Sequence, residues 1–266
     1  PKAGKRAKNG QFVVVRVQQQ PDNRRGPIGE IVEVLGDHMA PGMEIDVAIR
    51  SYGLPVEWPR AVIDGVDQVP AEVDSEMLAG RKDLRDTPFV TIDGADARDF
   101  DDAVFCRKSA TGYVLYVAIA DVAHYVTQGS ALDLEARERG TSVYFPDNVI
   151  PMLPEALSNG ICSLNPEVDR LVMICEMRFD ARGEMTKYRF YNGAIRSHAR
   201  LTYDEVATWL KAPAVAEKGS VKFHVATLYA LYLLLKERRD QRGALEFESQ
   251  EPYFVFNEQR KIERIE

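Results

Sequence analysis

The sequence is poor in the residues that build zinc sites and disulfide frameworks. Its 266 residues include only three cysteines, Cys106, Cys162 and Cys175, which are far apart and form no Cys-x-x-Cys pair. Neither a zinc site nor a disulfide framework is indicated, and we expect buried thiols in a reducing compartment. The four histidines have no metal-ligand spacing, so we expect structural or exposed roles for them.

Long apolar runs are also missing. The longest one, around Leu228 to Leu235, is too short to cross a bilayer. No N-terminal segment resembles a signal peptide. With an ordinary content of apolar and charged residues, these absences predict a cytoplasmic protein of one or two domains.

The charge is unevenly distributed along the chain. A net charge of −7 argues against a general nucleic-acid binder, yet the first segment is basic, with only Asp22 as acidic counterweight. Such a segment favours phosphate binding, although a solvated chain end explains it equally well. The basic residues are Lys2, Lys5, Arg6, Lys8, Arg16, Arg24 and Arg25.

Three β-branched runs predict a small antiparallel β unit near the N-terminus. They are Gln11 to Val17, Gly29 to Leu35 and Glu44 to Arg50, separated by turn sequences. A polar stretch from Ala61 to Arg85 is interpreted as a linker, with a short helix near Ala71 to Ala79.

The rest of the chain mixes strands and helices, which predicts an α+β fold. We expect strands at 113–123, 170–179, 185–196 and 253–257, with the middle two paired as a hairpin across Asp180 to Gly183. Capping boxes at Ser130 and Thr202 predict helices ending near Gly140 and Lys211. The longest helical pattern runs from Val221 to Arg242.

Four aspartates crowd into ten residues between two short apolar runs. Asp93, Asp99, Asp101 and Asp102 lie between 89–92 and 103–105. Because these runs draw the loop towards a core, where unpaired carboxylates are costly, a cation is expected there. Oxygen ligands without His or Cys favour Mg²⁺, or Mn²⁺, over zinc.

Two other interpretations of the acidic loop compete with a catalytic metal site. An EF-hand does not fit, because Ala95, Ala97 and Val104 occupy positions where ligands are needed. A plain surface acidic turn is the remaining alternative, which the spacing and the apolar flanks disfavour. Since no nucleophile with a partner base is visible, hydrolysis by metal-bound water is the natural chemistry.

Five segments in order along the chain resemble the catalytic domain of the RNase II (RNB) exoribonucleases, closest to the bacterial RNase R group. They are 91–103, 117–125, 140–146, 150–154 and 157–165. Residues 11–59 resemble part of the cold-shock domain that precedes the catalytic domain in that family, and cold-shock domains are OB-folds. The resemblance implies a partial OB-fold in 1–60, a linker in 61–85 and the N-terminal portion of an RNB domain in 86–266.

The resemblance also assigns roles by position. Asp93, Asp99 and Asp102 match the family's Mg²⁺-binding aspartates, and Asp101 matches the aspartate most tightly linked to cleavage. Tyr144 matches the aromatic residue that stacks on the 3′ end of the RNA. Such stacking is independent of sequence, because every base presents a π-face to an aromatic ring. The competing interpretation of Tyr144 is a half-buried packing residue of a strand.

By this resemblance the chain is expected to act on the 3′ end of single-stranded RNA and to release nucleoside 5′-monophosphates. A later arginine of the family, which contacts the scissile phosphate, and its S1 domain have no counterpart among these residues, so these 266 residues alone are expected to be inactive. Two other functions stay open. One is a non-catalytic RNA-binding module with a structural metal, and the other is a metal phosphoesterase acting on small molecules.

Overall fold

The protein is described by a computed structural model, in which the chain folds into two compact units. The structure describes residues 7–38, 40, 42–95, 97–146, 148–211, 216–247, 252, 254–257 and 262–265. The first unit comprises residues 1–58, 139–152 and 248–266, and the second comprises 59–138 and 153–247. Among the described residues, no helix is both long and apolar enough to cross a membrane.

The described part of the first unit contains three antiparallel strand pairs and one helix. Its elements are β1 (Gln11–Gln19), β2 (Ile28–Asp37), α1 (Met43–Ser51), β7 (Val143–Phe145), β8 (Asn148–Ile150), β12 (Phe254–Phe256) and β13 (Ile262–Ile265). The pairs are β1 with β2, β7 with β8 and β12 with β13. The first two expected strands and the strand near 253–257 are thus confirmed, and Tyr253 itself lies outside the described residues.

The predicted third strand at 44–50 is wrong, because this segment forms α1. Gly42, in the left-handed region at φ 81°, precedes the helix, and Glu44 and Asp46 occupy its first turn, where carboxylates favour the helix dipole. The apolar residues at 45, 47 and 49 fit a strand, but Ile45 and Ile49 also fall on one side of a helix. The structure follows the helical alternative.

The second unit is a seven-stranded sheet with helices around it. The strand order is β11-β4-β5-β6-β9-β10-β3. The strands are β3 (Lys82–Asp83), β4 (Val90–Asp93), β5 (Asp102–Ser109), β6 (Gly112–Ala120), β9 (Asp169–Asp180), β10 (Met185–Arg196) and β11 (Ala199–Thr202). β10 with β3 and β11 with β4 are the parallel pairs, and the other neighbours are antiparallel. The expected hairpin of β9 and β10 is confirmed.

Helices α4 (Ala131–Arg139) and α5 (Tyr203–Lys211) of the second unit begin at the predicted caps. The others are α2 (Arg60–Val66), α3 (Val122–Tyr125), a π-helical turn η1 (Ala156–Ile161) and α6 (Val221–Gln241). The α4, α5 and α6 predictions are confirmed. The strand expected at 113–123 ends earlier, at Ala120 of β6, and its last two residues belong to the unpredicted helix α3. The short helix expected at 71–79 is wrong, since turns and bends occupy that stretch and the helix lies earlier, at α2.

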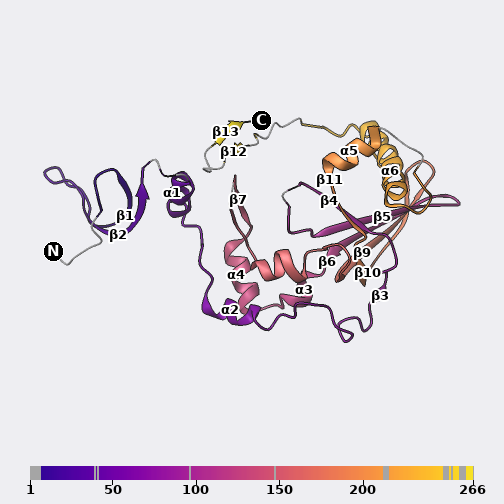
Figure 1. The fold of residues 1–266 in the computed structure, drawn as a ribbon, viewed down its shortest axis with the longest axis horizontal. Coiled ribbons are helices and arrows are strands. Elements are labelled where there is room, and N and C mark those ends of the chain that lie inside the picture. Colours follow the sequence, from indigo (N-terminus) through magenta and orange to yellow (C-terminus); the bar gives the residue numbers. More distant parts are fainter. Residues whose placement is uncertain are drawn as a thin grey trace. The chain divides into compact units, whose positions relative to one another are not determined.

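Helices α5 and α6 pack on one face of the sheet at its β11–β4–β5 end (Figure 1). Val225 of α6 packs with Val90 and Leu201, and Leu231 packs with Cys106 and Phe179. Burying such side chains contributes about 1.5 to 3 kcal/mol each. Val90 begins β4 and Leu201 is the next-to-last residue of β11, so this core anchors both strands against α6.

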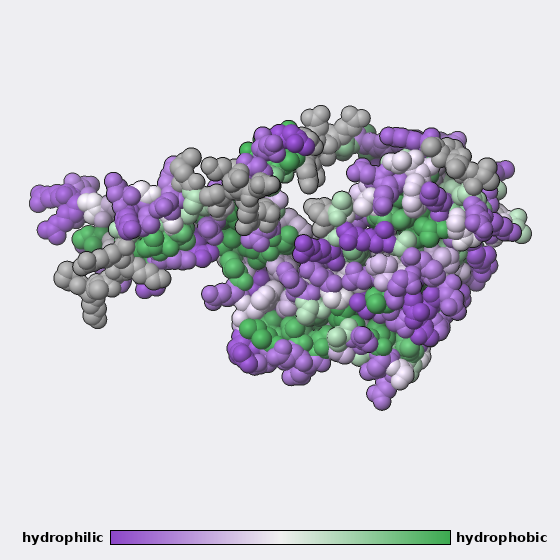
Figure 2. Space-filling model, viewed as in Figure 1, coloured by the Kyte–Doolittle hydropathy of each residue, from purple (hydrophilic) through white to green (hydrophobic). Residues whose placement is uncertain are grey.

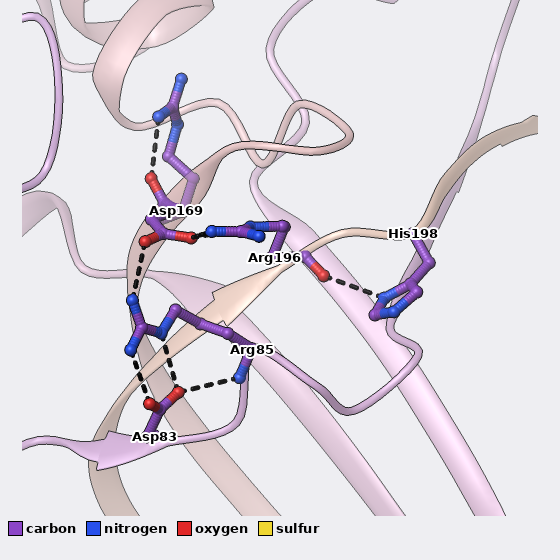
Figure 3. Close-up of polar contacts among 6 residues, drawn as sticks. Asp83, Arg85, Asp169, Arg196 and His198 are labelled. Atoms are coloured by element: carbon purple, nitrogen blue, oxygen red, sulfur yellow. Dashed lines mark hydrogen bonds and ion pairs between the residues drawn. The ribbon is translucent and has the colours of Figure 1, made fainter.

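An ion-pair network ties the edge strand β3 to β9 and β10 (Figure 3). Arg85 donates to Asp83 and, at 2.9 Å, to Asp169, while Arg196 donates to Asp169 from the neighbouring strand. Burial alone raises the pKa of Asp169, but the hydrogen bonds from Arg85 and Arg196 outweigh it and hold that pKa below its usual value. The network therefore favours the charged form of Asp169 and holds the short edge strand in register.

The three cysteines behave as inert thiols. Cys106 and Cys162 are buried, Cys175 is half-buried, and all three are free. Burial raises the pKa of Cys106 and of Cys162 to about 12, which keeps both protonated at neutral pH. This confirms the expectation of buried free thiols, apart from the partial exposure of Cys175.

Candidate active site

Asp93 is the last residue of β4 and lies beside the start of α5. The parallel register of β11 and β4 places Thr202 opposite Asp93, so that α5 begins next to this carboxylate. The predicted capping box holds that beginning: the Glu205 carboxylate accepts from the Thr202 amide at 2.8 Å, and the Glu205 amide donates to the Thr202 hydroxyl at 3.2 Å. The sequence thus fixes both the strand end and the helix start that flank Asp93.

The loop from β4 to β5 carries Asp99 and Asp101, and a buried serine fastens it. The Ser163 hydroxyl accepts from the Phe100 amide at 3.1 Å and donates to the Arg98 carbonyl at 2.9 Å. The Leu164 amide donates to the Phe100 carbonyl at 2.7 Å. Ser163 is only 1% exposed, so these bonds lie in the protein interior and hold the backbone on both sides of Asp99.

Arg200 holds the same loop from the outside. Its Nη2 atom donates to the carbonyls of Ala95, at 2.8 Å, and Ala97, at 3.1 Å. Its guanidinium also lies over the Phe100 ring, 4.7 Å from the ring centre. Arg200 belongs to β11, so a single side chain joins the acidic loop to the strand that neighbours β4.

Three of the four predicted aspartates are close enough to affect one another. Burial raises the pKa of the Asp102 carboxyl, and the neighbouring charges of Asp101 and Asp93 raise it further. Asp93, from the end of β4, is therefore near enough to Asp102, at the start of β5, to influence its charge. Asp102 is the first residue of β5, and Asp99 and Asp101 lie in irregular backbone before it.

Tyr203 is an additional residue of this site. Partial burial raises the pKa of its hydroxyl, and the carboxylates of Asp93 and Asp102 raise it further, the first of which shares a hydrogen bond with it. The side chain is 61% exposed at the first position of α5. A protonated hydroxyl beside two carboxylates can orient one of them and still face a ligand from solvent.

The carboxylates fit a hard cation in kind but do not form a finished coordination site. Among the described residues, no three His, Cys, Asp or Glu side chains converge closely enough to ligate one metal ion. The donors at the site are carboxylate oxygens, which Mg²⁺ and Mn²⁺ prefer. Burial, and then the charges of Asp101 and Asp93, disfavour the charged form of Asp102, and a cation at this site would favour it. The predicted ligands Asp93 and Asp102 are thus neighbours, while Asp99 lies half-buried in the loop between them.

Tyr144 lies in the first unit, in the middle of the short strand β7. It pairs with Val149 of β8, and its side chain is 65% exposed. Val143 and Phe145, on either side of it, are half-buried. The alternative of a half-buried packing tyrosine is therefore not supported.

The basic N-terminal segment is only partly described. Lys2, Lys5 and Arg6 lie outside the described residues. In the hairpin between β1 and β2, the Asp22 carboxylate accepts from the backbone amides of Arg24 and Arg25 at 2.7 and 2.8 Å, so the one acidic residue shapes the turn. Arg16, Arg24 and Arg25 are exposed.

Sequence reasoning missed Ser163, Arg200 and Tyr203. None of them stands within 60 residues of the aspartates, and the parallel pairing of β11 with β4 brings two of them near. The only local signal was the capping box at Thr202, which marks a helix start next to a tyrosine.

Comparison with known proteins adds a family to this geometry. The chain matches an RNB domain over residues 81–266 and a cold shock domain over residues 1–59. It is 52% identical over 263 residues to Ribonuclease R of Escherichia coli strain K12, and 43% identical over 261 residues to Ribonuclease R of Thermotoga maritima. The first match covers 98% of this chain and 32% of the relative, so the chain spans about a third of the length of such curated relatives.

Solved structures with the same fold include one bound to RNA. The chain superposes on Mycoplasma genitalium RNase R in complex with double-stranded RNA with a TM-score of 0.91 and 30% identity, covering 99% of this chain and 47% of that one. It also resembles yeast Ssd1, a pseudonuclease, with a TM-score of 0.66 over 87% of this chain and 29% of that one; at 19% identity this likeness shows the fold alone. These matches confirm the expected fold class, a cold-shock β unit followed by a mixed α/β domain, and the chain belongs to the RNB-domain family.

Proposed function

We propose that the protein is a divalent-metal-dependent exoribonuclease that hydrolyses RNA from its 3′ end and releases nucleoside 5′-monophosphates. The observation that carries this proposal is the match of residues 81–266 to the RNB domain, and the influence of Asp93 and Asp101 on the charge of Asp102 supports it. The similarity to Ribonuclease R over almost the whole chain supports RNA as the substrate. So does the RNA-bound state of a solved relative.

In this proposal Asp93, Asp99 and Asp102 hold Mg²⁺ or Mn²⁺. A divalent cation, when bound, supplies a Lewis acid for the phosphate and a water of lowered pKa. The chain supplies the orientation. The Asp93 carboxylate accepts from the Gly94 amide at 2.7 Å and from the Tyr203 hydroxyl, so its orientation is partly fixed before a metal binds.

Asp101 has a different position, which suits a role in the cleavage step itself. Its carbonyl accepts from the Ala120 amide at 2.8 Å, so its backbone is fixed to the end of β6 while its side chain is exposed. An exposed carboxylate on a fixed backbone can accept a proton from an attacking water.

A non-catalytic RNA-binding module remains the competing function. The same fold occurs in a protein described as a pseudonuclease, so the fold alone does not decide whether RNA is cleaved. This chain retains all four aspartates of the acidic loop, which favours catalysis.

One assay separates these functions. A 5′-labelled single-stranded RNA is incubated with a protein of the relatives' full length that carries this chain, with Mg²⁺ and with excess EDTA. We expect stepwise shortening from the 3′ end and mononucleotide products with Mg²⁺, and an intact RNA with EDTA. RNA binding without shortening under both conditions would establish the non-catalytic alternative. Hydrolysis of small phosphoesters by a protein that leaves RNA intact would establish a metal phosphoesterase acting on small molecules.

Asp93→Asn is expected to raise the Mg²⁺ concentration needed for half-maximal activity. The change removes one ligand charge while the amide keeps the size of the side chain. The measurement is a Mg²⁺ titration of initial rates. Asp74→Asn, an exposed carboxylate of the turn at 74–77, is the matched control and is expected to leave the titration unchanged. An unaltered titration in Asp93→Asn would exclude Asp93 as a ligand.

Tyr144→Ala is expected to change the length of the shortest RNA left undigested. Base stacking on an aromatic side chain contributes roughly 1 to 3 kcal/mol per base, so short substrates lose most while long RNA keeps other contacts. The end-product length is read from sequencing gels, and thermal unfolding is measured in parallel. Because Tyr144 is exposed, stability is expected to stay near that of the parent. A fall in stability with unchanged end products would assign Tyr144 to packing.

A further inference from the structure

A row of cationic side chains crosses the sheet on the face away from α6. The register pairs Arg107 of β5 with Val114 of β6, Val114 with Arg178 of β9, and Arg178 with Lys187 of β10. Directly paired residues of neighbouring strands share a face. Cys106, which precedes Arg107, packs against Leu231 of α6, so by alternation the row lies on the opposite face.

The next row carries the contacts that confirm this face. Glu176 pairs with Arg189, which donates to it through Nε at 3.0 Å, and the Tyr191 hydroxyl also donates to Glu176 at 3.0 Å. Arg178 and Lys82 reach the same carboxylate at 3.9 and 4.0 Å. Glu176 is 3% exposed and therefore lies beneath the cations that surround it.

We name these cations the basic band. Its five members are Lys82, Arg107, Arg178, Lys187 and Arg189. Burial alone would raise the pKa of Glu176, but the hydrogen bonds from Arg189 and Tyr191 hold it below its usual value, so the one carboxylate inside the band is charged. The other carboxylate on this face of β9 is Asp180, which accepts from two backbone amides of the turn after it. Positive charge therefore remains in excess.

The band keeps its positive charge exposed. The side chains of Lys82, Arg178 and Arg189 are 45%, 56% and 52% exposed. Arg107 and Lys187 are exposed as well, and the visible surface over β9 and β10 is mostly hydrophilic (Figure 2). The net charge of the protein is −7, so this excess of positive charge on one face has the opposite sign to the protein as a whole.

One pair in the band is unfavourable for folding. Arg178 and Lys187 are directly opposite in an antiparallel pair, where like charges destabilise the sheet. A carboxylate at either position would give an attractive pair with the same strand geometry. An anion that binds across Arg178 and Lys187 would relieve the repulsion between these two side chains.

We propose that the basic band binds the phosphate backbone of RNA outside the cleavage site. The choice of RNA as the polyanion rests on the proposed function. Asp102 shares the α6 face with Val104 and Cys106, so the band is on the opposite side of the sheet from that carboxylate. The RNA segment held by the band is therefore a different one from the nucleotide being hydrolysed.

The chemistry of the band favours phosphates over bases. From Arg107 to Lys187 the row spans three strand spacings, about 14 Å, which is room for several phosphates of one strand. Arginines present forked donors that match phosphate oxygens. The Tyr191 ring is occupied by Lys82 and Arg189, at 5.0 and 5.1 Å from its centre, so it offers no open stacking surface. Binding is expected to be independent of sequence.

The test compares two triple variants of this chain. Arg107→Gln/Arg178→Gln/Lys187→Gln neutralises the row and leaves the Glu176–Arg189 bonds intact. Lys218→Gln/Arg239→Gln/Arg242→Gln removes the same charge from exposed positions around α6. The affinity for a long single-stranded RNA is measured in EDTA over a series of salt concentrations, with circular dichroism to verify folding.

We expect the band variant alone to lower the slope of log affinity against log salt by about 2, because each phosphate contact on a single strand contributes roughly 0.7. Hydrolysis of a short oligonucleotide, measured in the longer protein, is expected to be unchanged. Equal slopes in the two variants would overturn the proposal. Polyglutamate, a polyanion without phosphates, is titrated in the same way, and a band variant that loses polyglutamate binding but keeps RNA binding would also overturn it. A lowered slope in a protein that hydrolyses no RNA would support the band and refute the proposed nuclease.

Lys187→Gln alone supplies a second readout. Removing one charge of the repelling pair is expected to raise the urea concentration at the unfolding midpoint while RNA affinity falls. A merely structural role for Lys187 predicts the opposite change in stability. A lower midpoint with unchanged RNA affinity would therefore contradict the proposal.

Discussion

Replacing Asp101 by Asn is expected to abolish RNA hydrolysis while RNA affinity stays within a few-fold of the parent. The change removes one negative charge from the reacting centre and alters no cation that contacts phosphates. Loss of a single preorganised group at a reacting centre costs about a hundred- to a thousand-fold in rate, and a proton acceptor is at least as important. The measurement is a single-turnover rate with Mg²⁺, beside an affinity measured in EDTA.

Asp86→Asn is the matched control for this experiment. Asp86 is an exposed aspartate of the same unit, in the turn before β4, and it is not among the site residues. We expect parental rate and affinity in this variant. If Asp101→Asn lost binding and turnover in equal measure, the carboxylate would act in holding RNA and the cleavage role would be refuted.

Much of the second unit follows from local sequence. The aspartates were recognisable because apolar runs flank them, and those runs form β4 and β5 as expected. The caps at Ser130 and Thr202 predicted the starts of α4 and α5, and the hydrogen bonds at both positions are present. A capping box is a strictly local interaction, which is why a sequence pattern suffices to find it.

Two short segments were assigned wrongly because their patterns are ambiguous. At 44–50 the apolar spacing fits a strand and a helix alike, and the carboxylates of Glu44 and Asp46 favour the first turn of the helix. At 71–79 the composition permits a helix, but Asp74 instead accepts from the amides of Glu76 and Met77 and closes a turn. Side-chain oxygens of aspartate compete with helix formation in this way.

The support of the acidic loop was beyond local prediction. Arg200 and Ser163 reach it from segments far along the chain, and only the tertiary fold makes them its neighbours. Similarly, the basic band exists only because four strands align Arg107, Arg178 and Lys187 in one row. In sequence these are three scattered cations.

Ser163→Ala is expected to loosen the acidic loop and to weaken both stability and metal-dependent activity. Its hydroxyl satisfies the Phe100 amide and the Arg98 carbonyl, and Ala leaves both without that partner. An unsatisfied buried backbone group costs about 1 to 3 kcal/mol, so the two together amount to about 2 to 6 kcal/mol. The thermal unfolding midpoint is expected to fall.

The effect on activity follows from where this loss occurs. The two backbone groups flank Asp99, so the acidic loop is less ordered in the Ser163→Ala variant. Because the loop must then become ordered when the metal binds, the variant is expected to bind the metal less tightly. Each 1.4 kcal/mol corresponds to a tenfold change in an equilibrium constant, so the Mg²⁺ requirement is expected to rise about tenfold or more. Ser158→Ala, which loses only a hydroxyl bond to the side chain of Asn159, is the control and is expected to leave both quantities unchanged. A destabilised Ser163→Ala protein with an unaltered Mg²⁺ titration would show that Ser163 supports the fold without positioning the aspartates.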